Sequence, residues 1–294
     1  MTELYHACDC DDIKTIKQLL SNGADIDEMF MENDTGAMTT CLISSCYTGC
    51  YKMTKILLEN NANVHIRDNM QNNAMHYACF YGDIEIVKLL LKYGASLKCE
   101  DRNGCNGLHI AVKYGCIELV KYALKNGIGV DETNNDESTS LHIACYQNVS
   151  IFFKLIKLLI KNGSNVNLFN RYGDTPLRIS CNNNDYLTCR LLLDNNANIN
   201  EIYYDGNTPF HVACNGKNYM IPKMMINKYP NMDLKKRNNN GETPYALAEK
   251  NDNHEVCTLL RKTMLKRLYI YSLIVQHDVF KHHIVKKTMS DFMK

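Results

Sequence analysis

Histidine and cysteine recur together in this sequence at a spacing that could bind a transition metal. The tetrapeptides HYAC, HIAC and HVAC occupy residues 76–79, 142–145 and 211–214, and YHACDCDD at residues 5–12 adds two cysteines and three aspartates. A histidine and a cysteine three residues apart share one face of a helix, so each such pair could supply two of the four ligands of a structural zinc site. No CxxC…CxxC spacing accompanies them.

These motifs belong to a longer repeat. Each contains an alanine that has a small counterpart at intervals of 33 to 38 residues along the chain. The eight positions are Ala7, Ser45, Ala78, Ala111, Ala144, Ser180, Ala213 and Ala248. A period of this length indicates one supersecondary unit stacked many times, so the histidines and cysteines occupy equivalent places in successive units.

Each unit predicts a turn and two helices. The stretch IEIVKLLLKYG at residues 84–94 carries apolar residues at helical spacing and ends in glycine, which tolerates the left-handed conformation of a helix C-cap. Six units place glycine or asparagine there: Gly23, Asn61, Gly94, Gly127, Gly163 and Asn196. In GDTPLRIS (173–180) and GNTPFHVA (206–213), glycine forms a turn, threonine caps a first helix, and proline fits that helix's first position.

These residues resemble the ankyrin repeat, whose signature is a glycine turn followed by Thr-Pro-Leu-His-x-Ala and a two-helix hairpin. The resemblance covers roughly residues 1–262 and implies an all-α repeat solenoid of about eight stacked helix-turn-helix units with β-hairpin fingers. We place the units at residues 1–27, 28–65, 66–98, 99–131, 132–167, 168–200, 201–234 and 235–262. Residues 263–294 lie outside the repeat, and we predict that they form a basic amphipathic helix that caps the last unit, with a recruiting tail as the alternative.

The resemblance implies packing roles for the recurring polar residues. The imidazoles of His76, His109, His142 and His211 are expected to bond to their own turn and to neighbouring backbone, which ties one unit to the next. The cysteines that follow the small residue are expected to act as small apolar side chains. Successive units stack about 8–10 Å apart, so their His–Cys pairs do not easily converge on one ion. We therefore expect no metal and no cofactor.

Two units depart from the pattern. The fifth contains extra residues in YQNVSIFF (146–153), which predicts a longer loop between its two helices. The seventh has Tyr229-Pro230 where the others have a Gly or Asn cap and an alanine. Proline removes a hydrogen-bond donor and restricts the residue before it, so we expect a locally rebuilt loop there.

The composition favours a non-catalytic intracellular protein. The 294 residues carry a formal net charge of +1, which gives no global attraction to nucleic acid or membranes. The N-terminal residues lack the basic and apolar segments of a secretory signal, and fourteen cysteines in a chain of this size indicate reduced thiols. We expect a cytoplasmic monomer that could also enter the nucleus. No phosphate loop, GxSxG or HExxH motif is present, which leaves a small hydrolase or transferase as a remote alternative.

A partner protein is expected on the concave face of the array, where aromatic residues and arginine would be the energetic anchors. The candidates are the finger residues Phe30, Met31, Arg67, Met70, Phe169, Arg171, Tyr172, Ile202, Tyr203, Tyr204, Lys236 and Arg237. The densest group is the set of four rings contributed by NLFNRYG and NEIYYDG, which we expect on two adjacent finger tips. Stacking of these rings between fingers is the alternative.

The function that we predict is binding that sequesters or blocks a cellular protein. An adaptor that delivers its target to ubiquitin ligation through the tail is the main rival. The degenerate repeats resemble ankyrin proteins of large DNA viruses or intracellular bacteria, which implies a host protein, with host immune signalling as one candidate process. Asn167 and Asn200 also resemble the substrates of the asparaginyl hydroxylase that modifies ankyrin repeats.

Overall fold

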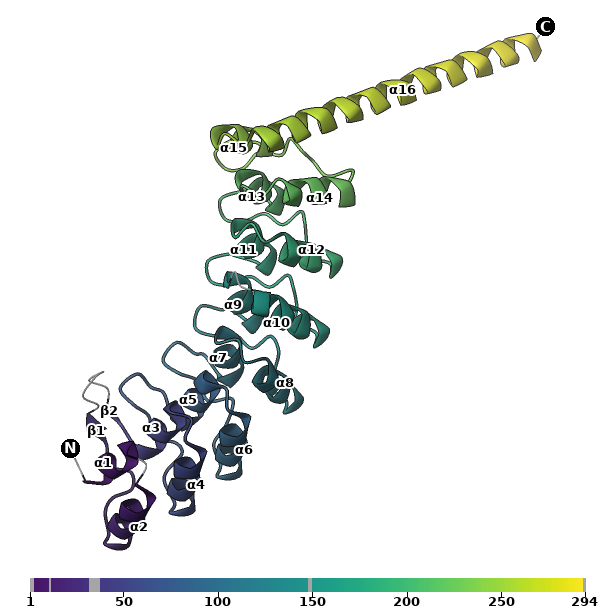
Figure 1. Cartoon of the computed structure of the whole chain (residues 1–294). Coiled ribbons are helices and arrows are strands. Elements are labelled where there is room, and N and C mark those ends of the chain that lie inside the picture. Colours follow the sequence, from purple (N-terminus) through teal and green to yellow (C-terminus); the bar gives the residue numbers. More distant parts are fainter. Residues whose placement is uncertain (1–2, 11, 32–37, 148–149, 293–294) are drawn as a thin grey trace. The chain divides into compact units, whose positions relative to one another are not determined.

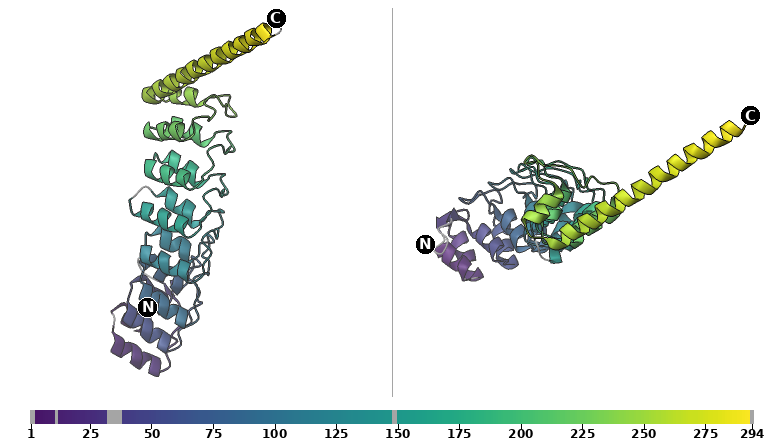
Figure 2. Two further views of the ribbon diagram at one scale, coloured as in Figure 1. Left: turned by 90° about the vertical axis from the view of Figure 1, so that its right-hand side faces the viewer. Right: turned by 90° about the horizontal axis from the view of Figure 1, so that it is seen from above.

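The computed structural model describes residues 3–10, 12–31, 38–147 and 150–292, with only the backbone described at residue 9 and from residue 274 onward. The chain divides into two compact units. Unit 1 comprises residues 1–180 and 191–197, and unit 2 comprises residues 181–190 and 198–294. Each unit is a row of helix pairs with extended fingers on one side of the helices (Figures 1 and 2).

The helices of the described residues follow one another in pairs. The first helices are α1 (Glu3–Asp9), α3 (Cys41–Tyr47), α5 (Ala74–Tyr81), α7 (Gly107–Lys113), α9 (Ser140–Tyr146), α11 (Pro176–Asn182), α13 (Pro209–Asn215) and α15 (Pro244–Lys250). The second helices are α2 (Ile13–Ser21), α4 (Tyr51–Glu59), α6 (Ile84–Lys92), α8 (Ile117–Lys125), α10 (Ser150–Lys161), α12 (Tyr186–Asp194), α14 (Met220–Lys228) and α16 (His254–Phe292). The predicted all-α repeat fold is confirmed.

Local sequence explains where these helices begin and end. Thr139 and Thr208 are N-caps, and the side chain of each accepts a hydrogen bond from the backbone N–H of the histidine three residues later. The predicted C-cap residues all have positive φ, from 66° at Asn196 to 91° at Gly163. Residues other than glycine and asparagine rarely adopt this backbone conformation, which accounts for the residue types found there.

The core of each repeat lies between its first and second helices. In unit 1 the second helices bury Leu57, Leu90 and Leu159 completely, and the small residues Ala78 and Ala111 of the first helices are equally inaccessible. Short side chains at these positions let the helices approach closely. The cysteines one residue later, including Cys46 and Cys79, are also fully buried, in agreement with their predicted apolar role.

From the second finger onward, each finger turns around one residue, and in five of these fingers that residue is a polar acceptor. Asp68, Asp101, Asn134, Asn170 and Asn238 occupy one repeat position, and a side-chain oxygen of each accepts the backbone N–H groups two and four residues later at 2.8–3.0 Å. The described fingers hold one pair of strands, β1 (Phe30–Met31) with β2 (Met38–Thr39), and one isolated bridge. The predicted β-hairpins are therefore polar turns in most of the described fingers.

The two unusual repeats have different outcomes. The extra residues of the fifth repeat extend its second helix, since α10 has twelve residues where α8 has nine; residues 148–149 of the predicted loop lie outside the described residues. The rebuilt loop of the seventh repeat is confirmed. Helix α14 ends at Lys228, and its C-cap residue Tyr229 has a φ of −124° instead of a left-handed conformation.

The tail is continuous with the last repeat. Helix α16 begins at His254 as the second helix of the eighth repeat and runs unbroken through residue 262 to Phe292. Between Leu265 and Leu273, its larger apolar side chains are exposed. The tail predicted as a separate cap is thus an extension of the repeat helix, and these apolar side chains are not covered by the array.

Candidate functional site

The recurring histidines bond to the scaffold, three of them through both ring nitrogens. The Nδ1 atoms of His76, His109, His142 and His211 accept hydrogen bonds from the backbone N–H of their N-cap residues at 3.0–3.2 Å. The Nε2 atoms of the last three lie 2.9–3.0 Å from carbonyl oxygens of the following finger. This confirms the predicted tie between successive repeats for His109, His142 and His211, whereas Nε2 of His76 is buried and has no hydrogen-bond partner among the described residues. Burial lowers the pKa of all four imidazoles, to about 4 at His76, so they stay neutral at physiological pH.

Most of the cysteines that follow the small residue of a repeat are buried thiols. The described residues contain no group of three or more histidine, cysteine, aspartate or glutamate side chains placed to hold a metal ion. Burial raises the pKa of the Cys46 thiol to about 12 and also raises the pKa values of Cys79 and Cys214. These buried thiols are therefore protonated and act as packing groups.

Two of the predicted anchors, Phe30 and Tyr203, are buried, so the prediction that they contact a partner is wrong. Phe30 is 6 % exposed, and its ring packs on Tyr5 with the ring centroids 3.9 Å apart. Tyr203 is 3 % exposed because it occupies the turn position that Asp or Asn fills in other fingers. Neither ring is available to a partner on the surface of the folded array.

The other apolar candidates are exposed, while two of the four predicted cations, Arg67 and Arg237, bond to finger backbone. Met31, Met70, Phe169, Tyr172, Ile202 and Tyr204 are exposed. Arg67 Nη1 donates to the carbonyl oxygens of Gln71 and Glu100 at 2.6 and 2.7 Å, and Arg237 Nη1 donates to that of Gly241. The carbonyl of Lys236 accepts a bond from His211. Phe169, Arg171 and Tyr172 belong to unit 1, and Ile202, Tyr203 and Tyr204 belong to unit 2.

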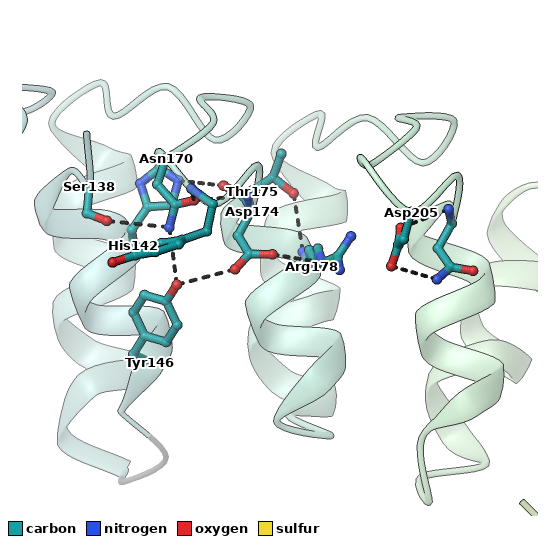
Figure 3. Close-up of polar contacts among 10 residues, drawn as sticks. Ser138, His142, Tyr146, Asn170, Asp174, Thr175, Arg178 and Asp205 are labelled. Carbon is teal, nitrogen blue, oxygen red and sulfur yellow. Dashed lines mark hydrogen bonds and ion pairs between the residues drawn. The ribbon is translucent and has the colours of Figure 1, made fainter. Parts of the chain in front are cut away.

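Polar contacts around the fifth repeat join a finger to a first helix of unit 1 (Figure 3). The hydroxyl of Tyr146 accepts a hydrogen bond from Asn170 Nδ2 at 3.1 Å and donates to Asp174 Oδ2 at 3.4 Å. Asp174 Oδ1 lies 2.7 Å from Arg178 Nε. The hydroxyl of Tyr172 also donates to Asp136 Oδ1 at 3.2 Å. This predicted partner-binding residue therefore stabilises a contact between two fingers.

An aromatic cluster that the sequence analysis missed lies on the first helices of unit 1. We call Tyr47, Tyr77, Phe80 and Tyr114 the aromatic ridge. The ring centroid of Tyr47 is 5.6 Å from that of Tyr77 and 5.7 Å from that of Phe80, and Phe80 is 4.3 Å from Tyr114. The ridge thus spans three successive repeats. Tyr47 and Tyr114 are about half exposed.

The repeat does not require these rings. Tyr47, Phe80 and Tyr146 stand two residues after the small residue of the first helix, but the equivalent positions of three other repeats hold Lys113, Asn182 and Asn215. An exposed aromatic cluster that the scaffold does not need usually marks an interaction surface. The sequence carries part of this signal in SCYTG, ACFYG and AVKYG, where a ridge ring follows the small residue by two or three positions.

A cleft adjoins the aromatic ridge. It has a volume of about 290 Å³ and lies between α5, α7 and their fingers. Its lining includes Tyr77, Phe80, Tyr114, Met70, Asp101 and Lys113. The hydroxyl of Tyr77 donates to the buried Asp68 at 2.5 Å, which fixes that ring. The cleft is large enough for a side chain of a partner, and it offers apolar walls with one carboxylate and one ammonium group.

The comparisons with known proteins concern the repeats. The sequence matches the family model described as ankyrin repeats (3 copies) over residues 4–101 and 108–203. No curated protein matches the chain. In the part of the chain that the structure describes, no helix has both the length and the apolar character needed to cross a membrane.

Proposed function

Because the chain belongs to the ankyrin-repeat family, a family that generally mediates protein–protein interaction, we propose that it is a non-catalytic module that binds a cellular protein and thereby sequesters or blocks it. The aromatic ridge carries this proposal, because it provides rings on three successive repeats and a cleft beside them. Interfaces gain most of their binding energy from a few such anchors. The exposed finger residues, led by Phe169 and Tyr172, remain a second candidate surface.

The proposal is tested with paired variants of the full chain. A partner is first captured by crosslinking from cell lysate, identified by mass spectrometry and purified. The Tyr47→Ala/Tyr114→Ala variant should then bind it about 30- to 1000-fold more weakly, which corresponds to a loss of about 2–4 kcal/mol. Both rings are about half exposed, so the thermal unfolding temperature should change little.

The matched control is Phe169→Ala/Tyr172→Ala, which removes two exposed rings from a finger of the same unit. We expect this variant to keep its affinity. If the control loses affinity and the ridge variant does not, the partner occupies the finger tips and the ridge assignment is wrong. Recovery of cullin or Skp-type components with the captured partner would favour the ubiquitin adaptor over sequestration.

A further inference from the structure

A groove in unit 2 combines apolar walls with uncompensated positive charge. It has a volume of about 770 Å³ and lies between the C-terminal end of α14, the loop that follows it, and α16. Ile226 and Pro230 line one wall, and Ile270 and Tyr271 of α16 line the other. None of these residues lies in the aromatic ridge or the fingers.

The groove exists because two repeats depart from the pattern. Pro230 follows a helix end that lacks the left-handed cap, and Met232 N donates to Tyr229 O at 3.1 Å in the rebuilt loop. Helix α16 continues past Lys262, which is its ninth residue. Arg267 Nη1 donates to Met232 O at 2.7 Å and so joins the extended helix to the rebuilt loop.

The cations of the groove have no carboxylate partners within it. Lys262, Lys266 and Arg267 line it, whereas no aspartate or glutamate does. Lys262 and Lys266 are exposed, are four residues apart on one helix face, and make no ion pair among the described residues. By contrast, Arg261 on the same helix lies 3.9 Å from Glu249.

Two further observations point to an external anion. The Nη2 atom of Arg267 is buried and has no hydrogen-bond partner among the described residues. The sequence contains no acidic residue between Glu255 and Asp278, so α16 cannot neutralise these cations from its own adjacent turns. Three like charges in one groove repel one another, and a bound carboxylate would relieve that repulsion.

We propose that this groove binds an acidic amphipathic segment of a partner protein. The apolar residues of the segment would cover Ile226, Pro230 and Ile270, while its carboxylates would pair with Lys262 and Lys266. A second copy of α16 is the poorer occupant, because its corresponding segment carries the same positive charges and no carboxylates. The site is separate from the aromatic ridge and does not depend on the function proposed for the ridge.

The test measures the binding of labelled helical peptides to the full chain by fluorescence anisotropy. A peptide of leucine and glutamate should bind, and binding should weaken with added salt. A peptide with serine in place of leucine and the same charge should bind at least about tenfold more weakly, because it lacks the apolar contact. Absence of binding by the leucine peptide, or equal binding of the two peptides, would overturn the proposal.

Variants locate the site. Lys262→Glu/Lys266→Glu should weaken binding of the leucine peptide by at least about tenfold. The control Lys217→Glu/Lys235→Glu changes the net charge equally at two exposed lysines of unit 2 outside the groove, and it should bind as the unaltered chain does. Equal losses in the two variants would reduce the effect to general electrostatic attraction and refute the site.

Two additional measurements keep the test decisive. If charge reversal disturbs folding, as judged by circular dichroism, Lys262→Gln/Lys266→Gln replaces it, and a smaller loss of affinity is expected.

Vesicles rich in phosphatidylserine are tested by sedimentation. If vesicles bind the chain through these lysines and the peptide does not, the groove faces an anionic lipid surface and the peptide proposal fails.

Discussion

At the scale of single residues, the histidines show how a group with reactive potential can serve the scaffold instead. His76 closes a capping box with Asn73, since each residue's side chain bonds to the backbone N–H of the other. The imidazole is 2 % exposed, and burial holds its pKa near 4. The ring therefore stays neutral in the folded chain at a pH where the same imidazole is already protonated in the unfolded chain.

This difference gives a prediction about pH. An unfolded histidine binds a proton near pH 6.5 and folded His76 only near pH 4, so its contribution to stability is full above pH 6.5 and declines as the pH falls toward 4. Between pH 7 and pH 5 the unaltered chain should lose about 2 kcal/mol more of its unfolding free energy than His76→Gln loses. Glutamine is a normal partner in a capping box and does not titrate, so that contact is expected to persist.

The measurement is urea unfolding followed by circular dichroism at several pH values. His65→Gln, at an exposed finger position, is the control for the replacement of a histidine by glutamine. Equal pH dependence of His76→Gln and the unaltered chain would show that His76 is not held neutral by burial.

At the scale of elements, the helix ends were predictable because their chemistry is local. A glycine or asparagine at one phase of the repeat requires only its own backbone conformation, and all six such residues adopt it. The finger turns were not predicted as polar turns, although Asp68, Asp101 and Asn170 recur at repeat spacing. Aspartate and asparagine are common in loops for several reasons, so their shared role emerged only from their hydrogen bonds.

A cap substitution separates backbone conformation from packing. Gly94 has φ of 89°, and no atom lies within 4 Å of the position that a Cβ would take. Gly94→Ala should therefore reduce the unfolding free energy by about 1–2 kcal/mol through conformation alone, and Gly94→Asn should cost less. Denaturant unfolding measures both, with Lys92→Ala at a nearby exposed helical position expected to stay within about 0.5 kcal/mol. A harmless Gly94→Ala would mean that the left-handed cap is not needed here.

At the scale of the whole molecule, the repeat period predicted the fold, but the candidate site depended on information that the period does not contain. The period specifies which positions face the core, so Leu90 and Cys79 were placed correctly. It does not distinguish an exposed ring from a buried one in a finger, which is why Tyr203 was misplaced. The aromatic ridge arises from residues on different repeats, and their proximity becomes visible only when the repeats are stacked.

The fourteen cysteines turn this architecture into a last prediction. All are free thiols, and eight are buried: Cys41, Cys46, Cys79, Cys145, Cys181, Cys189, Cys214 and Cys257. Cys10 is exposed. Alkylation requires an accessible thiolate, and burial both blocks access and, at Cys46, raises the pKa to about 12. Iodoacetamide at neutral pH should therefore label Cys10 first and leave the buried set unmodified until denaturant is added.

Peptide mapping by mass spectrometry after timed labelling gives the rate at each site. The denatured chain serves as the control, because all fourteen thiols should then react. A metal held by these residues would make the native labelling pattern depend on a chelator, whereas packing predicts the same pattern with and without it. If Cys46 and Cys79 react in the native chain as fast as Cys10, the close contacts between first and second helices do not persist in solution.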